Sequence, residues 1–301
     1  MYGRNYLGFI PGIEEFAWWL IRCFHSYADL TLVTSPQMRD EFVANGVSRV
    51  DVWRKGVDTI RFNPEFKDDE MRNKMTDGHA NDFLLVYVGR LGAEKRLKDL
   101  KPVLQRMPNA RLCIVGKGPQ EDELKEHFKG TKTVFTGQLS GDELSKAFAS
   151  ADVFLMPSDS ETLGFVVLES MASGVPVIGA NAGGIPSLID DNETSFLVPT
   201  GDVDAFVDRL KKLQDPVFRA AMGAKARREA EQWSWESATS VLRNIQYELA
   251  LLNFHSRAFG GFSRPSTLGL WRSLAIKIRR ALAKLRFPGF RREPETPEVV
   301  L

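Results

Sequence analysis

The stretch Phe83-Leu84-Leu85-Val86-Tyr87-Val88-Gly89 decides the fold, because six apolar or aromatic residues run without a break into a glycine. Such a run is typical of a strand that is buried on both faces of a sheet. Similar runs follow downstream, at 111–116, 133–137, 151–157 and 175–180. Segments of helical periodicity separate them, among them 120–129, 141–149 and 165–173. This alternation predicts an α/β domain of the Rossmann type, in which right-handed crossovers place helices on both faces of a parallel sheet.

The segments outside this regular region have a different character. Residues 1–62 hold two short apolar runs and some helical periodicity, too little to close a second sheet, so we expect the trailing part of an N-terminal domain. Residues 63–82 are dense in Asp, Asn and Lys and are predicted to be a hinge or linker. The regular region, 83–235, is predicted to be one complete domain, and 236–301 a C-terminal helix with a basic amphipathic tail.

Composition and charge exclude several classes of protein. The formal net charge of +1 gives no electrostatic reason to expect nucleic-acid binding. Two cysteines, Cys23 and Cys113, are too few for a disulfide framework, and the four histidines form no His-Glu-x-x-His run for a catalytic metal. The apolar run 16–21 is far shorter than the ~20 residues that span a bilayer. Neither a secretory signal nor a transit peptide is visible.

The C-terminal segment is strongly basic. Between Arg257 and Arg292 the sequence has ten basic residues and no acidic one, interleaved with large apolar side chains such as Trp271 and Phe287. This pattern is typical of an amphipathic helix that lies on an anionic membrane surface. A terminal helix packed on the body of the protein, or a disordered basic tail, has the same composition. We therefore treat peripheral membrane contact through 257–292 as an expectation.

Several helix boundaries are readable from the sequence. Ser35 and Pro36 have the residue types of an N-cap and a first helical position. Gly174 is expected to end the helix that begins near Phe165. The sequence Asp202-Val203-Asp204 matches the Asp-x-Asp pattern of metal-dependent sugar transferases, but it follows Gly201 at a helix start. We interpret Asp202 as an N-cap and reject it as a metal site.

Polar residues follow the first strand at the edge where ligands bind to an open parallel sheet. Gly89 is followed by two cations, Arg90 and Lys95, at the turn into the next helix. Fixed cations stabilise the negative charge that a diphosphate leaving group acquires; arginine does so through paired hydrogen bonds and lysine as a point charge. A solvated basic turn is an equally good interpretation of this loop alone.

Two other strands run into glycine-rich loops. Gly116-Lys117-Gly118-Pro119 follows the second strand, and Ala182-Gly183-Gly184-Ile185-Pro186 follows the fifth. Glycines permit close approach of the backbone to a ligand, although ordinary turns have the same composition. Lys117 is a possible phosphate or sulfonate contact, but we favour a surface lysine.

The strongest single pattern is a pair of carboxylates, Glu161 and Glu169, eight positions apart after the fourth strand. Glu161 falls in a loop, and Leu163, Gly164 and Phe165 open a helix whose free N–H groups form an anion site. Glu161 is suited to accept hydrogen bonds from sugar hydroxyls, and Glu169, two turns into the helix, to hold a ribose diol. Two acids also suggest a glycosidase, but this spacing favours the two ends of one long ligand. Each acid taken singly is explained as well by a cap-region or surface glutamate.

These motifs together resemble the retaining glycosyltransferases of the family that includes sucrose-phosphate synthases and bacterial mannosyltransferases. The resemblance rests on the Gly-Arg-Leu and Glu94-Lys95 residues, the Gly-x-Gly-Pro turn, the two glutamates and the Ala-Gly-Gly-Ile-Pro loop, and covers about residues 50–235. Within the family, the sequence most resembles the UDP-sulfoquinovose:diacylglycerol sulfoquinovosyltransferases. The segments that suggest this are 28–33, 55–58, 135–145, 160–164 and 243–247.

The resemblance implies a role for each matching residue. Arg90 and Lys95, after Gly89, would hold the donor diphosphate, Glu161 would orient the donor sugar, and Glu169 would bind the nucleotide ribose. Further donor-binding positions are Gly116, Gln138 and Leu139 beside the base, and Leu163, Gly164, Phe165 and Val166, whose helix start offers backbone amides.

The resemblance also implies a fold and a reaction. The fold would be GT-B, two facing Rossmann-like domains, here one complete domain and the remnant of a second. The reaction would transfer a sugar, sulfoquinovose, from UDP to the lipid acceptor diacylglycerol with retention of configuration, with no cofactor and no essential metal, at a chloroplast membrane; a cytoplasmic location is the alternative. A glucosyl or mannosyl transferase, or a truncated binding module without activity, is the alternative function.

The sequence departs from the family pattern in three places. The N-terminal domain is mostly missing, Lys117 stands where many relatives carry an acid, and Pro102 interrupts the helix expected after Lys95.

Overall fold

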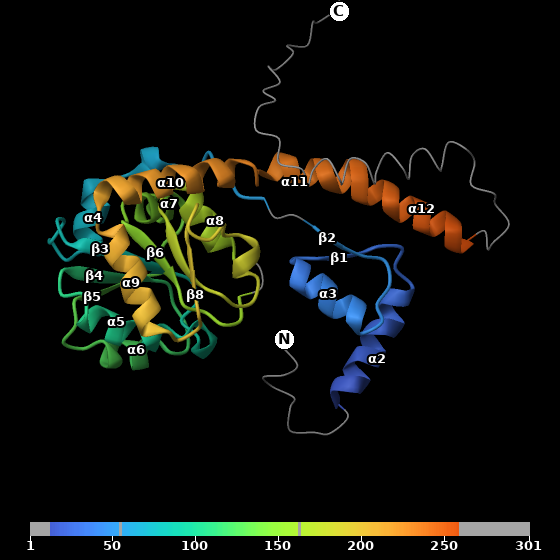
Figure 1. The fold of residues 1–301 in the computed structure, drawn as a ribbon, viewed down its shortest axis with the longest axis horizontal. Coiled ribbons are helices and arrows are strands. Elements are labelled where there is room, and N and C mark those ends of the chain that lie inside the picture. Colours follow the sequence, from blue (N-terminus) through green and yellow to red (C-terminus); the bar gives the residue numbers. More distant parts are fainter. Residues whose placement is uncertain (1–12, 54–55, 162–163, 259–301) are drawn as a thin grey trace, which may run out of the picture. The chain divides into compact units, whose positions relative to one another are not determined.

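The computed structural model describes residues 13–53, 56–161 and 164–258 of the chain (Figure 1). It divides into two compact units, 1–247 and 248–301. The first unit contains both sheets and the candidate site. The second is described only as far as residue 258, as part of one helix.

A six-stranded parallel sheet forms the centre of the first unit. Its strands are β3 (Phe83–Val88), β4 (Ala110–Val115), β5 (Thr133–Gly137), β6 (Val153–Met156), β7 (Val177–Ala180) and β8 (Phe196–Val198). They lie in the order β5-β4-β3-β6-β7-β8, and every neighbouring pair is parallel. The five strands predicted from the apolar runs are all present. Strand β8 was not predicted, because three residues are too short to show a period.

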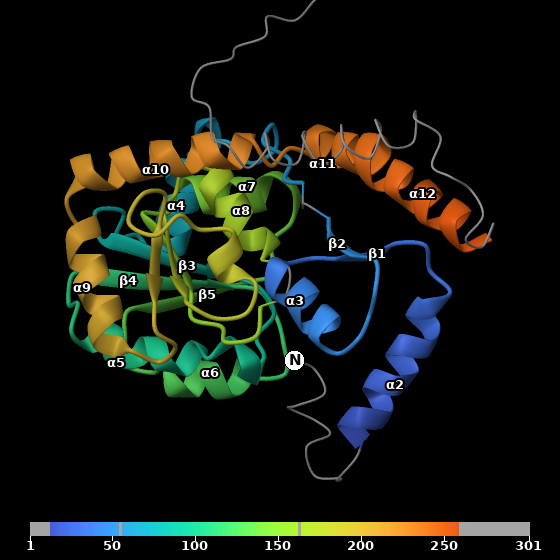
Figure 2. The same cartoon turned by 45° about the vertical axis from the view of Figure 1, so that its right-hand side comes forward.

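Helices cover both faces of this sheet. Figures 1 and 2 show α5 (Leu100–Gln105) and α6 (Glu121–His127) on one face, and α7 (Gly141–Ala149) and α8 (Phe165–Ala172) on the other. The helix α9 (Val203–Leu213) packs on α5, and α10 (Pro216–Glu231) packs on α8. Short 3-10 turns η2 (Ala93–Lys95) and η3 (Leu97–Asp99) precede α5, and η4 (Ile185–Ser187) follows β7. The expected doubly wound arrangement is therefore confirmed.

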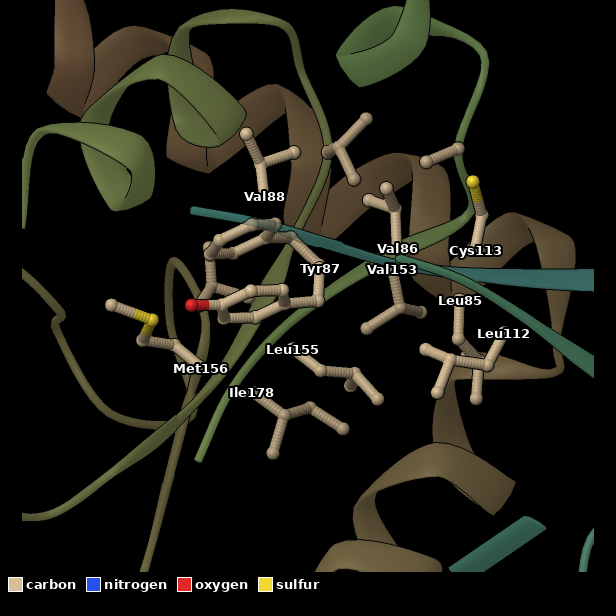
Figure 3. Close-up of a cluster of buried hydrophobic side chains, with 14 of the residues drawn as sticks. Leu85, Val86, Tyr87, Val88, Leu112, Cys113, Val153, Leu155, Met156 and Ile178 are labelled. Carbon is tan, nitrogen blue, oxygen red and sulfur yellow. The ribbon is translucent and has the colours of Figure 1, made fainter. Parts of the chain in front are cut away.

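The core lies between the sheet and its helices. Its fully buried side chains include Leu84, Leu85, Val86, Leu112, Ile114, Val153, Phe154, Val177 and Ile178. Figure 3 shows Tyr87 within this cluster, near Leu155, Met156 and Ile178. Burying one such aliphatic side chain contributes about 1.5–3 kcal/mol, so this continuous cluster holds the strands in register.

The order of the strands reverses between β3 and β6, which is where a crevice is expected in an open α/β sheet. These strands are hydrogen-bonded neighbours, but the chain leaves β3 for α5 on one face and leaves β6 for α8 on the other. Loops that diverge in this way leave space at the carboxyl ends of the two strands, which is the usual ligand site of an open α/β sheet.

The opposite, amino edge of the sheet is closed by charged groups. Asp152 accepts hydrogen bonds from the Leu84 N–H and from Arg72, both at 2.8 Å, and pairs with Arg219 at 3.1 Å. Arg72 also donates to the carbonyls of Ala80, Ser150 and Asp82. This cluster, the Asp152 network, fastens two helices to the starts of β3 and β6.

The stretch 63–82, predicted to be a hinge or linker, contains ordered elements. The 3-10 turn η1 (Pro64–Phe66) is followed by α4 (Asp69–Met75), which is capped by the Asp68 side chain. Met71 and Met75 belong to the buried core. Polar composition hid this helix, because only these two side chains face the core.

The N-terminal residues form a smaller two-stranded parallel sheet. It consists of β1 (Thr31–Val33) and β2 (Val50–Val52), with α2 (Ile13–Ser26) before β1 and α3 (Pro36–Ala44) between the strands. Ser35 caps α3 by accepting a hydrogen bond from the Met38 N–H, and Pro36 is its first residue, as predicted. The other two boundary predictions are also confirmed. Gly174 follows the C-cap of α8 with φ of 72°, and Asp202 caps α9.

Backbone contacts join the segment after β2 to the region after α10. The Val57 N–H donates to the Trp233 carbonyl at 2.7 Å. Gly56 packs so closely on Trp235 that an added Cβ would lie 2.6 Å from its Cα. The helix α11 (Trp235–Val241), the π-helical turn η5 (Leu242–Gln246) and α12 (Tyr247–Ala258) then follow.

From residue 259 on, the predicted basic tail lies outside the residues that the structure describes. Within the part of the chain that the structure describes, no helix is both long and apolar enough to cross a bilayer.

Candidate active site

The loop after β3 is shaped by a buried tyrosine. The Tyr87 hydroxyl donates to the Arg90 carbonyl at 2.9 Å, and burial raises the pKa of that phenol, so it remains a donor. The Arg90 side chain is 61% exposed and pairs with Glu94 at 2.5 Å. Lys95 is the last residue of the turn η2.

Lys95 reaches across the crevice between β3 and β6. Its Nζ donates to Oε2 of Glu161 at 2.7 Å, and the two side chains are 14% and 15% exposed. The structure thus brings together two residues, 66 positions apart, that the sequence predicted for different parts of one ligand. A lysine ammonium has three N–H donors, so one contact leaves donor capacity for an anion.

Glu161 is held rigidly from its backbone and its side chain. Its carbonyl accepts a hydrogen bond from the Gly184 N–H at 2.6 Å, and its Oε1 accepts one from the Gly164 N–H at 3.1 Å. A Cβ added to Gly183 would lie 2.5 Å from the Glu161 carbonyl oxygen. The glycine loop after β7 therefore supports Glu161 by close backbone packing.

The start of α8 lies beside this carboxylate. Gly164 is the N-cap residue with φ of 61°, and Phe165 is the first helical residue. The first N–H groups of a helix have no partner within it, so they attract an anion together with the helix dipole. Val166 belongs to this first turn, whereas Leu163, which was also predicted to contribute, lies outside the described residues.

Glu169 lies in the second turn of α8 and is partly buried. Burial raises its pKa to about 7, and the positive charge of Arg61 opposes that shift. A carboxylate in this environment is costly to ionise, because it has lost part of its hydration. Hydroxyl groups of a ligand would restore hydrogen bonds to it.

The loop after β4 packs on the loop after β3. A Cβ on Gly116 would lie 1.9 Å from the Gly89 carbonyl oxygen, and one on Gly118 would lie 2.4 Å from that of Leu91. The Leu91 N–H donates to the carbonyl of Lys117, whose side chain is exposed. Both glycines are required for the contact between these two loops, and a role of Gly116 in donor binding stays a prediction.

The loop after β5 completes the edge. Gly137 ends the strand with φ of 72°, and its carbonyl accepts a hydrogen bond from the Gly116 N–H at 2.8 Å. Gln138 is exposed at this edge and Leu139 is buried. Of the two, only the Gln138 side chain faces solvent, while Leu139 anchors the loop.

Two polar links between the β3 and β6 loops were not foreseen. The Ser158 hydroxyl donates to the Glu94 carbonyl at 3.1 Å, and Arg96 lies 3.6 Å from Asp159. Arg96 itself has the left-handed φ of 51°. A serine directly after a buried strand was the available signal, because such a residue falls at the ligand edge.

No group of three or more His, Cys, Asp or Glu side chains that could hold a metal ion occurs among the described residues. Asp202, the rejected metal ligand, accepts a hydrogen bond from the Ala205 N–H at 2.9 Å as an N-cap. The chemical groups gathered at this edge are therefore cations, carboxylates and a helix start.

A parallel sheet with cations and two glutamates at its strand ends agrees with the class of sugar-transferring enzymes that the sequence resembles. Residues 69–229 match the family model described as Glycosyl transferases group 1, and the chain belongs to this family. It is 46% identical over 241 residues to Sulfoquinovosyl transferase SQD2 of Arabidopsis thaliana, over 78% of this chain and 47% of that protein. It is 35% identical over 226 residues to a GDP-mannose-dependent alpha-mannosyltransferase of Mycobacterium tuberculosis, over 74% of this chain and 58% of the relative.

The chain spans about half the length of the curated relatives it matches. Among solved structures, sucrose-phosphate synthase from Thermosynechococcus elongatus aligns with a TM-score of 0.66 at 24% identity, over 84% of this chain and 65% of that one. The predicted GT-B-type α/β fold, one complete parallel-sheet domain and a smaller second part, is confirmed.

Proposed function

We propose that this chain carries the donor-binding half of a retaining glycosyltransferase that moves sulfoquinovose from UDP to diacylglycerol in sulfolipid biosynthesis. The observation that carries the proposal is the contact of Lys95 with Glu161 at 2.7 Å, beside the start of α8. It puts a cation, a sugar-orienting carboxylate and helix amides at one crevice, which are the groups that a sugar nucleotide requires.

The diphosphate would lie between the β3 loop and the start of α8. Negative charge develops on it as the bond to the sugar breaks, and preorganised cations stabilise that charge most in the transition state. Lys95 is the better placed of the two cations, because its side chain is only 14% exposed and a charge pair is stronger away from water. Arg90, on the outer side of the loop, would close over the phosphate after leaving Glu94.

The sugar and the nucleoside would lie on either side of the diphosphate. Glu161 would accept hydrogen bonds from sugar hydroxyls while Lys95 holds it in place, and Glu169 would accept them from the ribose diol. Gln138 would flank the base. The acceptor hydroxyl would enter on the face that the diphosphate leaves, so configuration is retained, and no essential metal is proposed.

The choice of sulfoquinovose and a lipid acceptor is supported by the 46% identity to the sulfoquinovosyl transferase of Arabidopsis. By the same likeness we propose a chloroplast membrane as the location. The basic segment 257–292 would give peripheral contact with anionic lipid.

A GDP-mannose transferase is the second candidate, because mannosyltransferases are 35% identical over a similar share of the chain. A binding module without transfer activity is the third, because the chain spans about half of its relatives.

One assay separates these candidates. The full chain is incubated with diacylglycerol in anionic vesicles and with UDP-sulfoquinovose, UDP-glucose or GDP-mannose, and the lipid product is measured. The proposal predicts product from UDP-sulfoquinovose alone. Product from another donor reassigns the substrate. Calorimetric binding of UDP without any transfer supports the binding module, and no binding of UDP or GDP overturns the proposal.

A further inference from the structure

Arg61 occupies a turn whose backbone is fixed on both sides. Its N–H donates to Oδ1 of Asp58 at 3.0 Å, and the Phe62 N–H donates to the Asp58 carbonyl at 2.9 Å. Arg227 donates to the carbonyls of Thr59 and Phe62 at 3.0 and 2.7 Å. The Phe62 ring is anchored against the core residue Phe148 at a centroid distance of 5.7 Å. The position of the Arg61 Cα is therefore set by the body of the domain.

The Arg61 side chain extends from this turn toward two parts of the candidate site. A Cβ added to Gly141, which opens α7 directly after the β5 loop, would lie 3.6 Å from Nη2 of Arg61. The positive charge of the same guanidinium opposes the rise in the pKa of Glu169 that burial causes, so the two groups lie within electrostatic range of each other. Arg61 thus lies next to the start of α7, which follows the loop of Gln138, and within electrostatic range of Glu169.

The contacts within the described residues give no stabilising role to the Arg61 side chain. Among the residues that the structure describes, the Arg61 guanidinium makes no hydrogen bond and no ion pair, and it is exposed. A solvated surface arginine is the ordinary explanation for such a residue. That explanation does not account for a rigid backbone that presents the cation at the site edge.

The position of Arg61 relates it to the nucleoside rather than to the diphosphate. Glu169 lies roughly 7 Å further along α8 than Gly164, because each helical residue rises about 1.5 Å. Lys95 contacts Glu161 at the other end of this stretch. A guanidinium next to Gly141 and within electrostatic range of Glu169 would therefore meet the ribose and base of a ligand whose phosphates lie at Lys95.

We propose that Arg61 is a nucleoside-binding residue, whose guanidinium donates hydrogen bonds to the ribose and the base carbonyl of the donor opposite Glu169. The inference rests on the proposed donor site and adds a binding residue from the segment before the sheet domain. A planar guanidinium with five N–H groups suits two neighbouring acceptors, whereas lysine offers only a point charge.

The test measures two affinities for the full chain and three variants. Titration calorimetry gives the affinity for UDP, and displacement of bound UDP gives the affinity for uridine. Arg61→Ala is expected to weaken both ligands by about tenfold, because a hydrogen bond from a charged donor is lost in each. Arg61→Lys is expected to recover part of the loss. Arg106→Ala is the matched control, since that arginine is exposed, contacts Asp204 at the surface and lies between α5 and the start of β4. It should bind as the unchanged chain does.

The outcomes separate this inference from the function it rests on. If the unchanged chain binds neither UDP nor GDP, both the proposed function and the role of Arg61 are overturned. If the unchanged chain binds UDP and Arg61→Ala binds UDP and uridine equally well, the nucleoside contact is overturned and the proposed function stands. A loss confined to UDP, with uridine unaffected, would also overturn it, because Arg61 would then act on the phosphates. Unfolding midpoints of the variants check that Arg61→Ala is folded.

Discussion

Ion pairs occur at both edges of the six-stranded sheet, but their surroundings differ. At the amino edge, Asp152 satisfies two arginines and one backbone N–H at once. At the carboxyl edge, Lys95 makes one ion pair, with Glu161. Ser158 and Arg96 add two polar links between the β3 and β6 loops, and the β3 and β4 loops meet through glycine backbones. The charged groups of the amino edge hold elements of the fold together, whereas at the carboxyl edge the cation Lys95 lies beside the start of α8. That difference supports the proposal that the donor binds at the carboxyl edge.

The largest effect on stability is expected from Asp152→Ala at the amino edge. The change leaves Arg72 and Arg219 without their shared partner and the Leu84 N–H without an acceptor. Breaking a buried pair from one side costs about 3–5 kcal/mol of unfolding free energy, which urea denaturation measures. Glu121→Ala, which removes a surface pair with Lys125, should leave the unfolding free energy almost unchanged. A loss below about 1 kcal/mol for Asp152→Ala would break the comparison.

A smaller loss is expected from Gly116→Ala at the carboxyl edge. The new Cβ would meet the Gly89 carbonyl oxygen at 1.9 Å, and φ of 139° is unfavourable for alanine. Overpacking of this kind costs about 2–3 kcal/mol in urea denaturation. Gly130→Ala is the control, because its φ of 79° is also left-handed but no atom lies within 4 Å of the new Cβ. It should cost about 1–2 kcal/mol. Equal losses in the two variants would show that loop contact is unimportant.

The smallest effect is expected from Glu169→Gln, and it depends on pH. The folded-state pKa of about 7 lies above the ordinary value of 4.5, so between these pH values the folded chain holds a proton that the unfolded chain has released. Stability of the unchanged chain therefore falls as pH rises from 4.5 to 7 and stays low above it. At pH 8 the variant should be more stable by about 1–2 kcal/mol, and near pH 4 the two should be equal.

Thermal unfolding across this pH range measures the effect of Glu169→Gln. The control is Glu126→Gln, a change at a glutamate whose side chain is 75% exposed. A constant difference between Glu169→Gln and the unchanged chain at all pH values would contradict the role of burial.

Much of this fold was predictable because its signals are local. Continuous apolar runs gave β3 to β7, and cap residues such as Ser35 and Asp202 gave helix starts. The strand order is not local: it places β6 beside β3 and so brings Glu161 to Lys95. The sequence therefore suggested Lys95 and Glu161 as members of the candidate site but not their contact with each other. The packing of Gly116 and Gly118 against the β3 loop was also not predictable, since a pattern of glycines does not say whether a ligand or another loop comes close.

The central claim, that the crevice between β3 and β6 binds the diphosphate of a sugar nucleotide, is tested most directly by titrating UDP into the full chain and into Lys95→Ala. The account predicts a loss of affinity of at least about 30-fold for Lys95→Ala, because a charge-assisted contact to phosphate is removed in a partly buried place. Lys98→Ala, a change at a nearby lysine that pairs with Glu123 at the surface, should bind within about twofold of the unchanged chain. Equal affinities of the unchanged chain and Lys95→Ala for UDP would contradict the claim.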